Sequence, residues 1–517
     1  MAKRFKKVLA IIMALILTMT VGLNAFAIDL TGGIDQNGEN WTWNQAEKNL
    51  TLNGANVNEG FVLVDGSNVI VSADSIVNGG DNSAFSCEGT LSISGSDNKL
   101  TLTGSNGISA ESVVIENTEV DIDAGSCGIY VYNEEGDANV TLENVEGSIT
   151  GGYAGIYVQG ECSGTDASVE INNSDLEVTS EATSWNNRAR KSGITVYTSK
   201  AEKVDGSISI NDSKVVATGY DAGLSINNYV GDADATNDAC STININNSTV
   251  VAEGTSGTWA GIFASVLGQH EDADTTINIV DSSVYAVSPN TGILTSSQKG
   301  ESKIVLDNSI LGASGKTALS MIEETSQKQV AELKNGSTYV QMTPDAVMKG
   351  EIANFDGKTI IATEGEGITY DRENNYFVIP QGSVVIENFT DGTSVEYRFE
   401  NQAGGVGGFN YAKEEVWGFD VPDDNGNDDP IIEEEEEEED ENEPTVIVDE
   451  PTPLDDAPSA PEEQYDVPET ETIVDEEVPL ADVPGLGDES AIWMLVAAFA
   501  VFSLVVINTP EKKRGED

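Results

Sequence analysis

The sequence is poor in histidine, the residue type most often used for metal binding and acid–base chemistry. Its 517 residues include a single histidine, His270, in the polar segment GQHEDADT. Metal sites built from several histidines are therefore excluded. Any pairing of serine or cysteine with histidine would have to use this one residue. A catalytic role for His270 is not favoured, and we assign no catalytic residue.

Cysteine is also scarce, and no two of the four cysteines have the C-x-x-C spacing of a zinc site. They are Cys87, Cys127, Cys162 and Cys240. Export would permit disulfides, but the sequence does not say which cysteines would pair. Buried free thiols are an equally good interpretation.

Basic residues are few: 25 Lys and Arg stand against 89 Asp and Glu, for a formal net charge of −64. Such a chain repels nucleic acid and anionic lipid. The composition therefore excludes non-specific binding of phosphate polymers and is compatible with divalent cations.

The two ends of the sequence predict export and anchoring. Residues 1–27 combine a basic cluster, an apolar run and the cleavage pattern Ala25-Phe26-Ala27, as in a secretory signal peptide. An uncleaved anchor is the alternative. A second apolar run, Ala491–Ile507, is close to the shortest length that spans a bilayer. The basic tail 508–517 follows it, so the bulk of the chain should face outward.

The segment 422–490 is rich in Asp, Glu and Pro and contains no Lys or Arg. Its low hydrophobicity and one-sided charge predict disorder, and self-repulsion extends such a chain. We expect a stalk that separates the folded region from the membrane.

What is abundant is a short repeated pattern, as in STININNSTVVAEG at 241–254 and GSISINDSKVVAT at 206–218. Each copy has an apolar alternation, then Asn or Asp, then a second alternation. Successive copies lie 27 to 39 residues apart, with their Asn or Asp at Asn117, Asn144, Asn173, Asp212, Asn247, Asp281 and Asn308. A variable period around a fixed pattern indicates one structural unit with loop insertions.

Each unit contains three short runs of period two, the third of the form Gly-Ile-x-Val. Period two predicts strands, and stacking of equivalent strands would bury one continuous core. The predicted fold is all-β: a right-handed parallel β-helix over 28–320, a three-sheet solenoid of about ten coils. An array of β-sandwiches is disfavoured because hairpin dipeptides are scarce within the repeats.

The open ends of such a stack need covers. Trp41 and Trp43 in NWTWN are expected to close the first end. A C-terminal cap over 321–421 is expected to close the other, with a helix near Met321–Leu333 followed by β segments. Ser383–Asn388 repeats the letters of Ser112–Asn117, which suggests degenerate coils.

The asparagines themselves are interpreted as corners, because Asn and Asp tolerate left-handed backbone. We predict that Asn144, Asn173 and Asn247 stack as a ladder down one corner.

The outward residues of the third run predict an exposed stripe of aromatic and amide groups. Aromatic faces stack on sugar rings, and amides bond sugar hydroxyls. A ladder that only stabilises the sheet is the alternative. The candidate carbohydrate-binding residues are Tyr130, Tyr132, Tyr157, Gln159, Tyr197, Asn227, Phe263, Trp185 and Trp259.

Two loop groups are further candidates. Acidic inserts could supply oxygen ligands to calcium; the candidate ligands are Asp232, Asp234, Asp238, Glu271, Asp272 and Asp274. The basic segment NNRARKSG could meet an anionic ligand such as a uronic acid, through Arg188, Arg190 and Lys191. In both cases solvated surface loops are the alternative.

The end of the chain resembles the C-terminal sorting signal of Gram-positive surface proteins, through VPLADVPGLGD, the apolar run and KKRGED. The resemblance implies recognition by sortase and attachment to the cell wall. The pentapeptide corresponds to Val483, Pro484, Gly485, Leu486 and Gly487. Leu486 stands where the family has Thr, so a permanent membrane anchor is the alternative.

The folded region resembles the pectate-lyase-like superfamily, and especially the secreted carbohydrate-binding β-helix domains of clostridia, through WTWN, NLTLNG, GTLSISGSDNKLTLTG and the Gly-Ile-x-Val strands. The resemblance implies polysaccharide binding, sometimes with calcium. No lyase site of that family is matched.

Three functions follow as hypotheses. The first is a surface-anchored polysaccharide-binding or adhesin-like protein. The second is a lyase or hydrolase of acidic polysaccharide, which would need two carboxylates roughly 5–10 Å apart if it hydrolyses. The third is a passive structural surface protein. The first is favoured mainly because a large rigid repeat on an extended stalk suits presentation, and also because catalytic signatures are absent.

Overall fold

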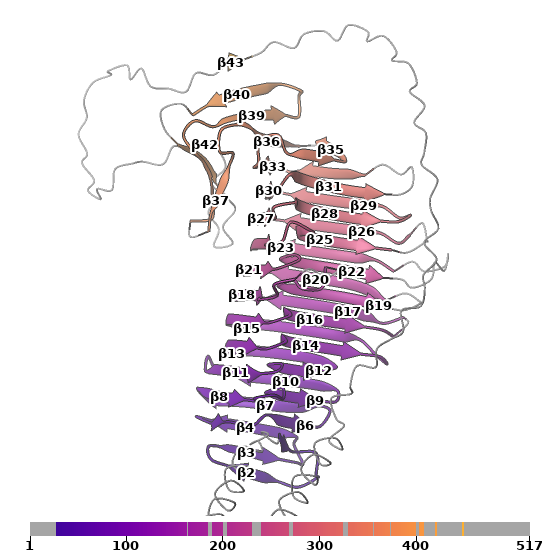
Figure 1. Cartoon of the computed structure of the whole chain (residues 1–517), viewed down its shortest axis with the longest axis vertical. Coiled ribbons are helices and arrows are strands. Elements are labelled where there is room, and N and C mark those ends of the chain that lie inside the picture. The colour runs from indigo at the N-terminus through magenta and orange to yellow at the C-terminus, as the bar shows by residue number, and fades with distance from the viewer. Residues whose placement is uncertain are drawn as a thin grey trace, which may run out of the picture. The chain divides into compact units, whose positions relative to one another are not determined.

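The protein is all-β in the residues that its computed structural model describes (Figure 1). These are residues 27–162, 164–184, 189–199, 204–229, 239–267, 272–323, 329–354, 356–372, 374–399, 403–407, 419–420 and 447–448. No helix occurs among them, and none therefore is long and apolar enough to cross a membrane.

One sheet contains twelve described strands, each paired in parallel with its neighbours. We call it the third face, because it holds the third run of each repeat. Its strands are β1 (Ile28–Asp29), β6 (Phe61–Leu63), β9 (Phe85–Cys87), β12 (Ile108–Ala110), β14 (Cys127–Asn133), β16 (Ala154–Gly160), β19 (Ile194–Ser199), β22 (Leu224–Tyr229), β25 (Ala260–Val266), β28 (Thr291–Ser297), β31 (Thr317–Glu323) and β34 (Val347–Lys349).

A second, larger sheet contains two parallel series, which we call the first and second faces. The first face is formed by β4 (Asn49–Asn53), β7 (Ser67–Ala73), β10 (Thr90–Gly95), β13 (Ser112–Ala124), β15 (Ala138–Gly151), β17 (Asp166–Asn172), β20 (Asp205–Asn211), β23 (Ser241–Asn246), β26 (Thr275–Val280), β29 (Ser302–Asp307), β32 (Val330–Lys334) and β35 (Glu351–Asn354). Strands β13 and β15 are long and continue into the second face.

The remaining strands of the second face are β5 (Asn56–Val57), β8 (Ser75–Asn78), β11 (Lys99–Gly104), β18 (Asp175–Ser180), β21 (Lys214–Gly219), β24 (Thr249–Gly254), β27 (Ser283–Val287), β30 (Ile310–Ser314), β33 (Ser337–Gln341) and β36 (Gly357–Glu364). The chain visits the three faces in turn, so each strand pairs with its equivalent in the preceding and following repeats. These long parallel sheets are consistent with a β-helix or solenoid.

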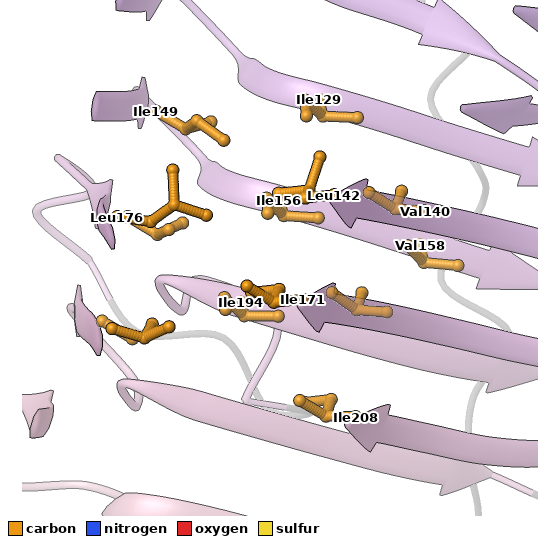
Figure 2. Close-up of a cluster of buried hydrophobic side chains, with 14 of the residues drawn as sticks. Ile129, Val140, Leu142, Ile149, Ile156, Val158, Ile171, Leu176, Ile194 and Ile208 are labelled. Atoms are coloured by element: carbon orange, nitrogen blue, oxygen red, sulfur yellow. The ribbon is translucent and has the colours of Figure 1, made fainter. Parts of the chain in front are cut away.

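Alternate residues of all three faces point inward and form one apolar core. Ile129, Ile156 and Ile194 are paired along the third face and are fully buried. Figure 2 shows them meeting Leu142 and Ile171 of the first face. Burial of each such side chain contributes roughly 1.5–3 kcal/mol, which explains why the repeat preserves its apolar alternation.

The corner between the first and second faces is built on the predicted Asn and Asp residues. All seven have positive φ, from 45° at Asn247 to 55° at Asn144. The Asn144 amide donates to Asn117 Oδ1 at 2.9 Å, and that of Asn247 donates to Asp212 Oδ1 at 2.5 Å. The predicted corner column is therefore present, although Asn173 donates to Glu143 rather than to Asn144.

A buried serine ladder, absent from the sequence predictions, runs beside this corner. Each serine oxygen accepts a hydrogen bond from the backbone N–H of the equivalent residue one repeat earlier, at 3.0 to 3.1 Å. The members are Ser174, Ser213, Ser248, Ser282, Ser309 and Ser337, all buried. Because a buried N–H without a partner is costly, these bonds fix how successive repeats dock.

Antiparallel strands cover the first end, as predicted from NWTWN. β2 (Gln36–Gly38) pairs with β3 (Trp41–Asn44), and β3 pairs with β4. Trp43 is buried, and the Trp41 ring packs edge-on against Phe61 at 5.2 Å between centroids.

The second end differs from the prediction. Parallel pairing continues past residue 320, through β34, β35 and β36. The helix expected near Met321–Leu333 is wrong for the described residues of that range. They belong to β31 and β32, whose alternate side chains Met321, Ala331 and Leu333 enter the core and whose backbone pairs with the preceding repeat.

The degenerate coils suggested for Ser383–Asn388 are also wrong, because the chain reverses there. β39 (Val384–Phe389) is antiparallel to β36, and β40 (Ser394–Arg398) is antiparallel to β39. Two residues of the expected stalk, β43 (Ile447–Val448), pair with β40. These antiparallel strands cover the edge that the last parallel strand would expose.

A separate four-stranded sheet packs against the flank of the second face. It comprises β37 (Thr369–Asp371), β38 (Tyr376–Ile379), β41 (Gly404–Gly407) and β42 (Phe419–Asp420). Tyr370 lies on Tyr285 with ring centroids 4.9 Å apart, and Arg372 pairs with Glu253. A Cβ on Gly312 would lie 2.1 Å from the Phe377 ring. Only glycine allows this approach.

The predicted export and anchoring segments lie outside the described residues. This applies to the signal peptide apart from Ala27, to the run Ala491–Ile507 with its basic tail, and to the sorting pentapeptide Val483–Gly487. The chain divides into two units, and the second, Thr452–Asp517, is wholly outside the described part.

Candidate functional site

The outward face of the third sheet brings the predicted stripe residues into register. Tyr130 is paired with Tyr157, which is followed by Thr195, Ser225 and Phe263 in successive strands. A second column contains Tyr132, Gln159, Tyr197, Asn227 and Ser265. Both columns follow from the period-two alternation of the strands.

The predicted exposure of this stripe is wrong for much of its length. The exposed fractions are only 4% for Tyr157, 2% for Tyr197 and 4% for Phe263. Asn227 is buried as well, whereas Tyr130, Tyr132 and Gln159 are half-buried. Residues from the turns that precede the strands pack over the stripe. The accessible part is therefore its N-terminal end, on β14 and β16.

Three tyrosines form a cluster at this end. The rings of Tyr130 and Tyr157 are stacked with centroids 5.8 Å apart, and Tyr153 meets Tyr157 edge-on at 5.7 Å. Burial raises the pKa of all three phenols above the usual value near 10. The three phenols are therefore neutral hydrogen-bonding groups attached to an apolar surface.

The predicted basic residues belong to the same cluster. The Arg190 guanidinium lies 4.7 Å from the Tyr197 ring centroid, and its Nη1 donates to the Tyr157 hydroxyl at 3.4 Å. Lys191 Nζ lies 5.7 Å from the Tyr153 ring and donates to Ser184 Oγ at 2.7 Å. Both cations are half-buried, so cation–π contact accounts for their position. Arg188 and Trp185 lie outside the described residues.

A second aromatic cluster lies further along the same face. Trp259 meets Phe263 edge-on at 5.0 Å between centroids. Phe263 is enclosed by small residues of three successive repeats, namely Ala189 and Ala222 in turns and Ala260 at the start of β25. This arrangement matches the alternative of a ladder that stabilises the sheet.

Polar groups extend from the accessible end of the stripe. The Tyr157 hydroxyl donates to Gln159 Oε1 at 3.0 Å, and Gln159 Nε2 donates to Glu161 Oε1 at 2.7 Å. Tyr132 donates to Glu134, and this bond to a carboxylate raises the pKa of the phenol. Aromatic rings next to amide and carboxylate groups are suited to the mixed polar and apolar faces of a sugar.

The described residues do not supply a calcium site. Asp232, Asp234, Asp238 and Glu271 lie outside the described part. In the described ranges no three Asp, Glu, His or Cys residues converge as metal ligands. Asp272 and Asp274 alone fall short of the six to eight oxygens that calcium takes.

Asp274 has a structural use that sequence reasoning missed. Its Oδ1 accepts the backbone N–H of Glu301 at 2.6 Å, one repeat later. Asp205 Oδ1 likewise accepts the backbone N–H of Cys240 at 2.8 Å, and Asp137 Oδ1 accepts that of Asp166 at 3.0 Å. The sequence signal that could have revealed these bonds is an acidic residue at the start of a first-face strand.

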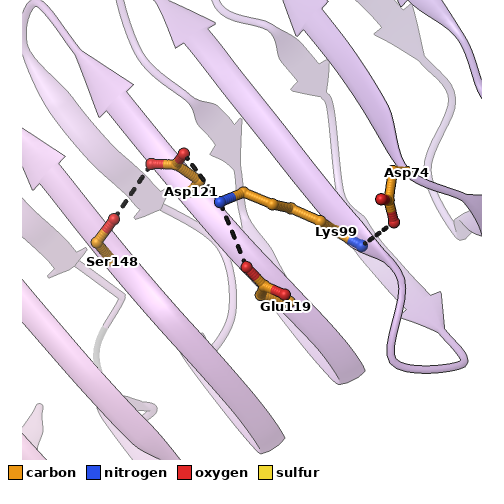
Figure 3. A network of polar contacts seen from close by, with 5 residues as sticks. All are labelled: Asp74, Lys99, Glu119, Asp121 and Ser148. Carbon is orange, nitrogen blue, oxygen red and sulfur yellow. Dashed lines mark hydrogen bonds and ion pairs between the residues drawn. The ribbon is translucent and has the colours of Figure 1, made fainter.

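The second face carries a column of charges that was also not predicted. Figure 3 shows its first pair, Lys99 and Glu119. Glu119, Glu146 and Asp175 are paired in successive strands, with Lys99 before them and Lys214 after them. Lys99 Nζ lies 3.3 Å from the Glu119 carboxylate, and Lys214 Nζ lies 3.5 Å from that of Asp175. The two lysines offset the repulsion between the carboxylates of Glu119, Glu146 and Asp175, which lie directly opposite one another on neighbouring strands.

No disulfide joins any of the four cysteines. Burial raises the pKa of Cys127 to about 11 and that of Cys87 to about 12. Thiols that remain protonated at neutral pH are poor nucleophiles, so these two act as small apolar residues of the core.

Taken together, the accessible end of the third face offers an aromatic surface with polar neighbours. Comparison with family models, with curated proteins and with solved structures finds no match.

Proposed function

We propose that the chain is an exported protein that displays a polysaccharide-binding, adhesin-like parallel β-helix on the outer surface of a Gram-positive cell. The finer architecture is part of this proposal: a three-sheet β-helix of about ten coils, which is right-handed because parallel crossovers favour the right hand. The three parallel series and the column of corner residues support it.

The observation that carries the function is the tyrosine cluster at the accessible end of the third face. Tyr130 is stacked on the buried Tyr157, so its ring is held in place before any ligand arrives. Tyr132 and Gln159 are paired beside it and are half-buried. Preorganised aromatic rings lower the ordering cost of binding.

The display part of the proposal is supported by the sequence. An extended acidic stalk over 422–490 would carry the β-helix away from the cell surface. The chain would be held there either by a permanent membrane anchor at 491–507 or by a sortase that joins the pentapeptide at 483–487 to the cell wall. The clostridial resemblance stated above supports the same location and a glycan partner. Calcium is part of the proposal only because the acidic inserts could supply its ligands. Glycan retention measured with and without a chelator tests whether calcium is needed.

The decisive experiment is retention on a glycan array, with and without chelator. We expect the full-length protein to bind and the Tyr130→Ala/Tyr132→Ala variant to lose retention. Tyr376→Ala, which removes a half-buried tyrosine of the flank sheet, serves as the matched control. Thermal unfolding of both variants separates lost binding from lost fold.

Other results would reject the proposal. Absence of retention on every glycan would favour a passive structural protein. Release of unsaturated or new reducing ends from a glycan would favour a lyase or hydrolase.

A further inference from the structure

A groove of about 470 Å³ lies at the corner where the second face turns into the third. It is lined at the ends of four successive strands, β24, β27, β30 and β33. Neighbouring strands lie about 4.8 Å apart, so the groove extends about 14 Å along the stack. This direction and length suit a short stretch of a linear polymer.

The turns at this corner explain why the groove lies in these repeats. In an earlier repeat the residues 181–193 join the second face to the third and place Arg190 over the tyrosine cluster. In the later repeats the joining residues are only 288–290 and 315–316. A Cβ on Gly254 would lie 2.4 Å from the Ala260 carbonyl oxygen, so the floor carries little side-chain volume.

The charges at the groove favour an anion, although the whole chain is strongly acidic. Glu253 is the one carboxylate among the described lining residues, and it is paired with Arg372, which follows β37 of the flank sheet. Lys316 is exposed on the lining and has no ion pair with a described residue. Salt screens exposed charges beyond about 8 Å at physiological ionic strength. The local cation therefore outweighs the distant acidic residues.

Hydroxyl groups complete the lining. Ser314 Oγ and Thr343 Oγ1 lie 3.1 Å apart, and Thr343 Oγ1 accepts the backbone N–H of Gly315 at 3.2 Å. Thr255 is exposed at the other end. Each hydroxyl can donate one hydrogen bond and accept two, so these groups retain capacity for sugar hydroxyls.

We propose that this groove is a second glycan-binding site, which takes a short stretch of a linear glycan and holds an oxyanion of one sugar unit against the Lys316 ammonium. The inference rests on the proposed function, because it assigns a glycan partner to the same protein. The inference adds a binding site that is remote from the tyrosine cluster. It also specifies that the ligand carries a negative charge.

Titration calorimetry of the full-length protein in detergent tests this inference. The probes are a short oligogalacturonide, its neutral methyl ester and a sulfated galactan oligomer. We expect Lys316→Met to weaken binding of an anionic oligomer roughly tenfold, as for a charge-assisted hydrogen bond, and to leave the methyl ester unaffected. The oligogalacturonide and the sulfated oligomer distinguish carboxylate from sulfate as the preferred anion.

Two further variants sharpen the test. Lys99→Met removes a half-buried lysine of the second face, at the ion pair with Glu119, and should leave affinity unchanged. Thr255→Trp should obstruct the groove and weaken every probe, because the residue is exposed and can be enlarged without entering the core.

Equal affinity of Lys316→Met and the unmodified protein for the anionic oligomers would overturn the inference, as would failure of the unmodified protein to bind any of them. If array retention is still lost with Tyr130→Ala/Tyr132→Ala in that case, the proposed function stands and only the groove is rejected.

Discussion

The hydroxyl oxygen of Ser248 accepts a hydrogen bond at 3.1 Å from the backbone N–H of Ser213, which lies 35 residues earlier in the chain. The backbone N–H of Ser248 donates in turn to Ser282 Oγ at 3.0 Å. Each repeat thus supplies the acceptor that the previous repeat needs at a buried position.

Replacement of Ser248 by alanine should destabilise the protein by about 1–3 kcal/mol, because it leaves the buried N–H of Ser213 without an acceptor. The loss should appear as a lower urea midpoint. Ser207→Ala, on the outward side of β20, is the matched control and should change stability by less than about 0.5 kcal/mol. Equal effects of the two variants would contradict the ladder's role.

Replacement of Tyr339 by phenylalanine should raise stability by roughly 1 kcal/mol, because it removes a polar group buried without compensation. The Tyr339 hydroxyl is fully buried and has no hydrogen-bond partner among the described residues. Tyr157→Phe is the contrasting variant and should lower the thermal midpoint, because it deletes the bond to Gln159. A decrease in stability for Tyr339→Phe would show that its hydroxyl has a partner in solution.

Stability should fall as the pH rises above about 10, the ordinary pKa of tyrosine in an unfolded chain. Burial raises the pKa of Tyr285 to about 12 in the folded protein. The folded state therefore favours the neutral phenol, so this contribution is fully present below pH 10 and is lost as the pH approaches 12. A shift of this size corresponds to about 2–3 kcal/mol.

Urea unfolding between pH 8 and pH 12 measures this loss. In the Tyr285→Phe variant the loss of stability between pH 8 and pH 12 should be smaller by about 2–3 kcal/mol. The remaining buried tyrosines should still contribute to the loss. An unchanged pH profile for Tyr285→Phe would contradict the assignment.

Replacement of Gly312 by alanine should detach the flank sheet from the second face. The added Cβ would lie 2.1 Å from the Phe377 ring, and overpacking of this kind costs about 1–3 kcal/mol. We expect faster proteolysis within 369–379, with cleavage mapped by mass spectrometry. Gly257→Ala is the control, because nothing lies within 4 Å of a Cβ added there. The protease should cleave this variant at the same rate as the unmodified protein.

Local patterns predicted the strands and corners because their causes are local. Ile243 and Ile245 lie in the core because alternate residues of a strand share one side. Asn247 lies at a corner because its side chain tolerates positive φ. The serine ladder could have been found in the same way, since a serine follows Asp212, Asn247 and Asp281.

The errors came from contacts that no local pattern records. The burial of Tyr197 depends on Arg190, which reaches its ring from a preceding turn. The helix expected near Met321 rested on a short apolar pattern that pairing with the preceding strands overrides. The direction of β39 is set by its partner β36, although its sequence repeats that of a parallel strand.

The corner residues and serines also bear on how such a chain can change length during evolution. From Ser174 to Ser337, each repeat presents the same buried serine acceptor and backbone donor to its neighbours. A gene duplication that inserts one whole repeat would therefore create two junctions of a kind already present. The antiparallel covers at the two ends would be unaffected, and the protein could be lengthened or shortened in steps of one repeat.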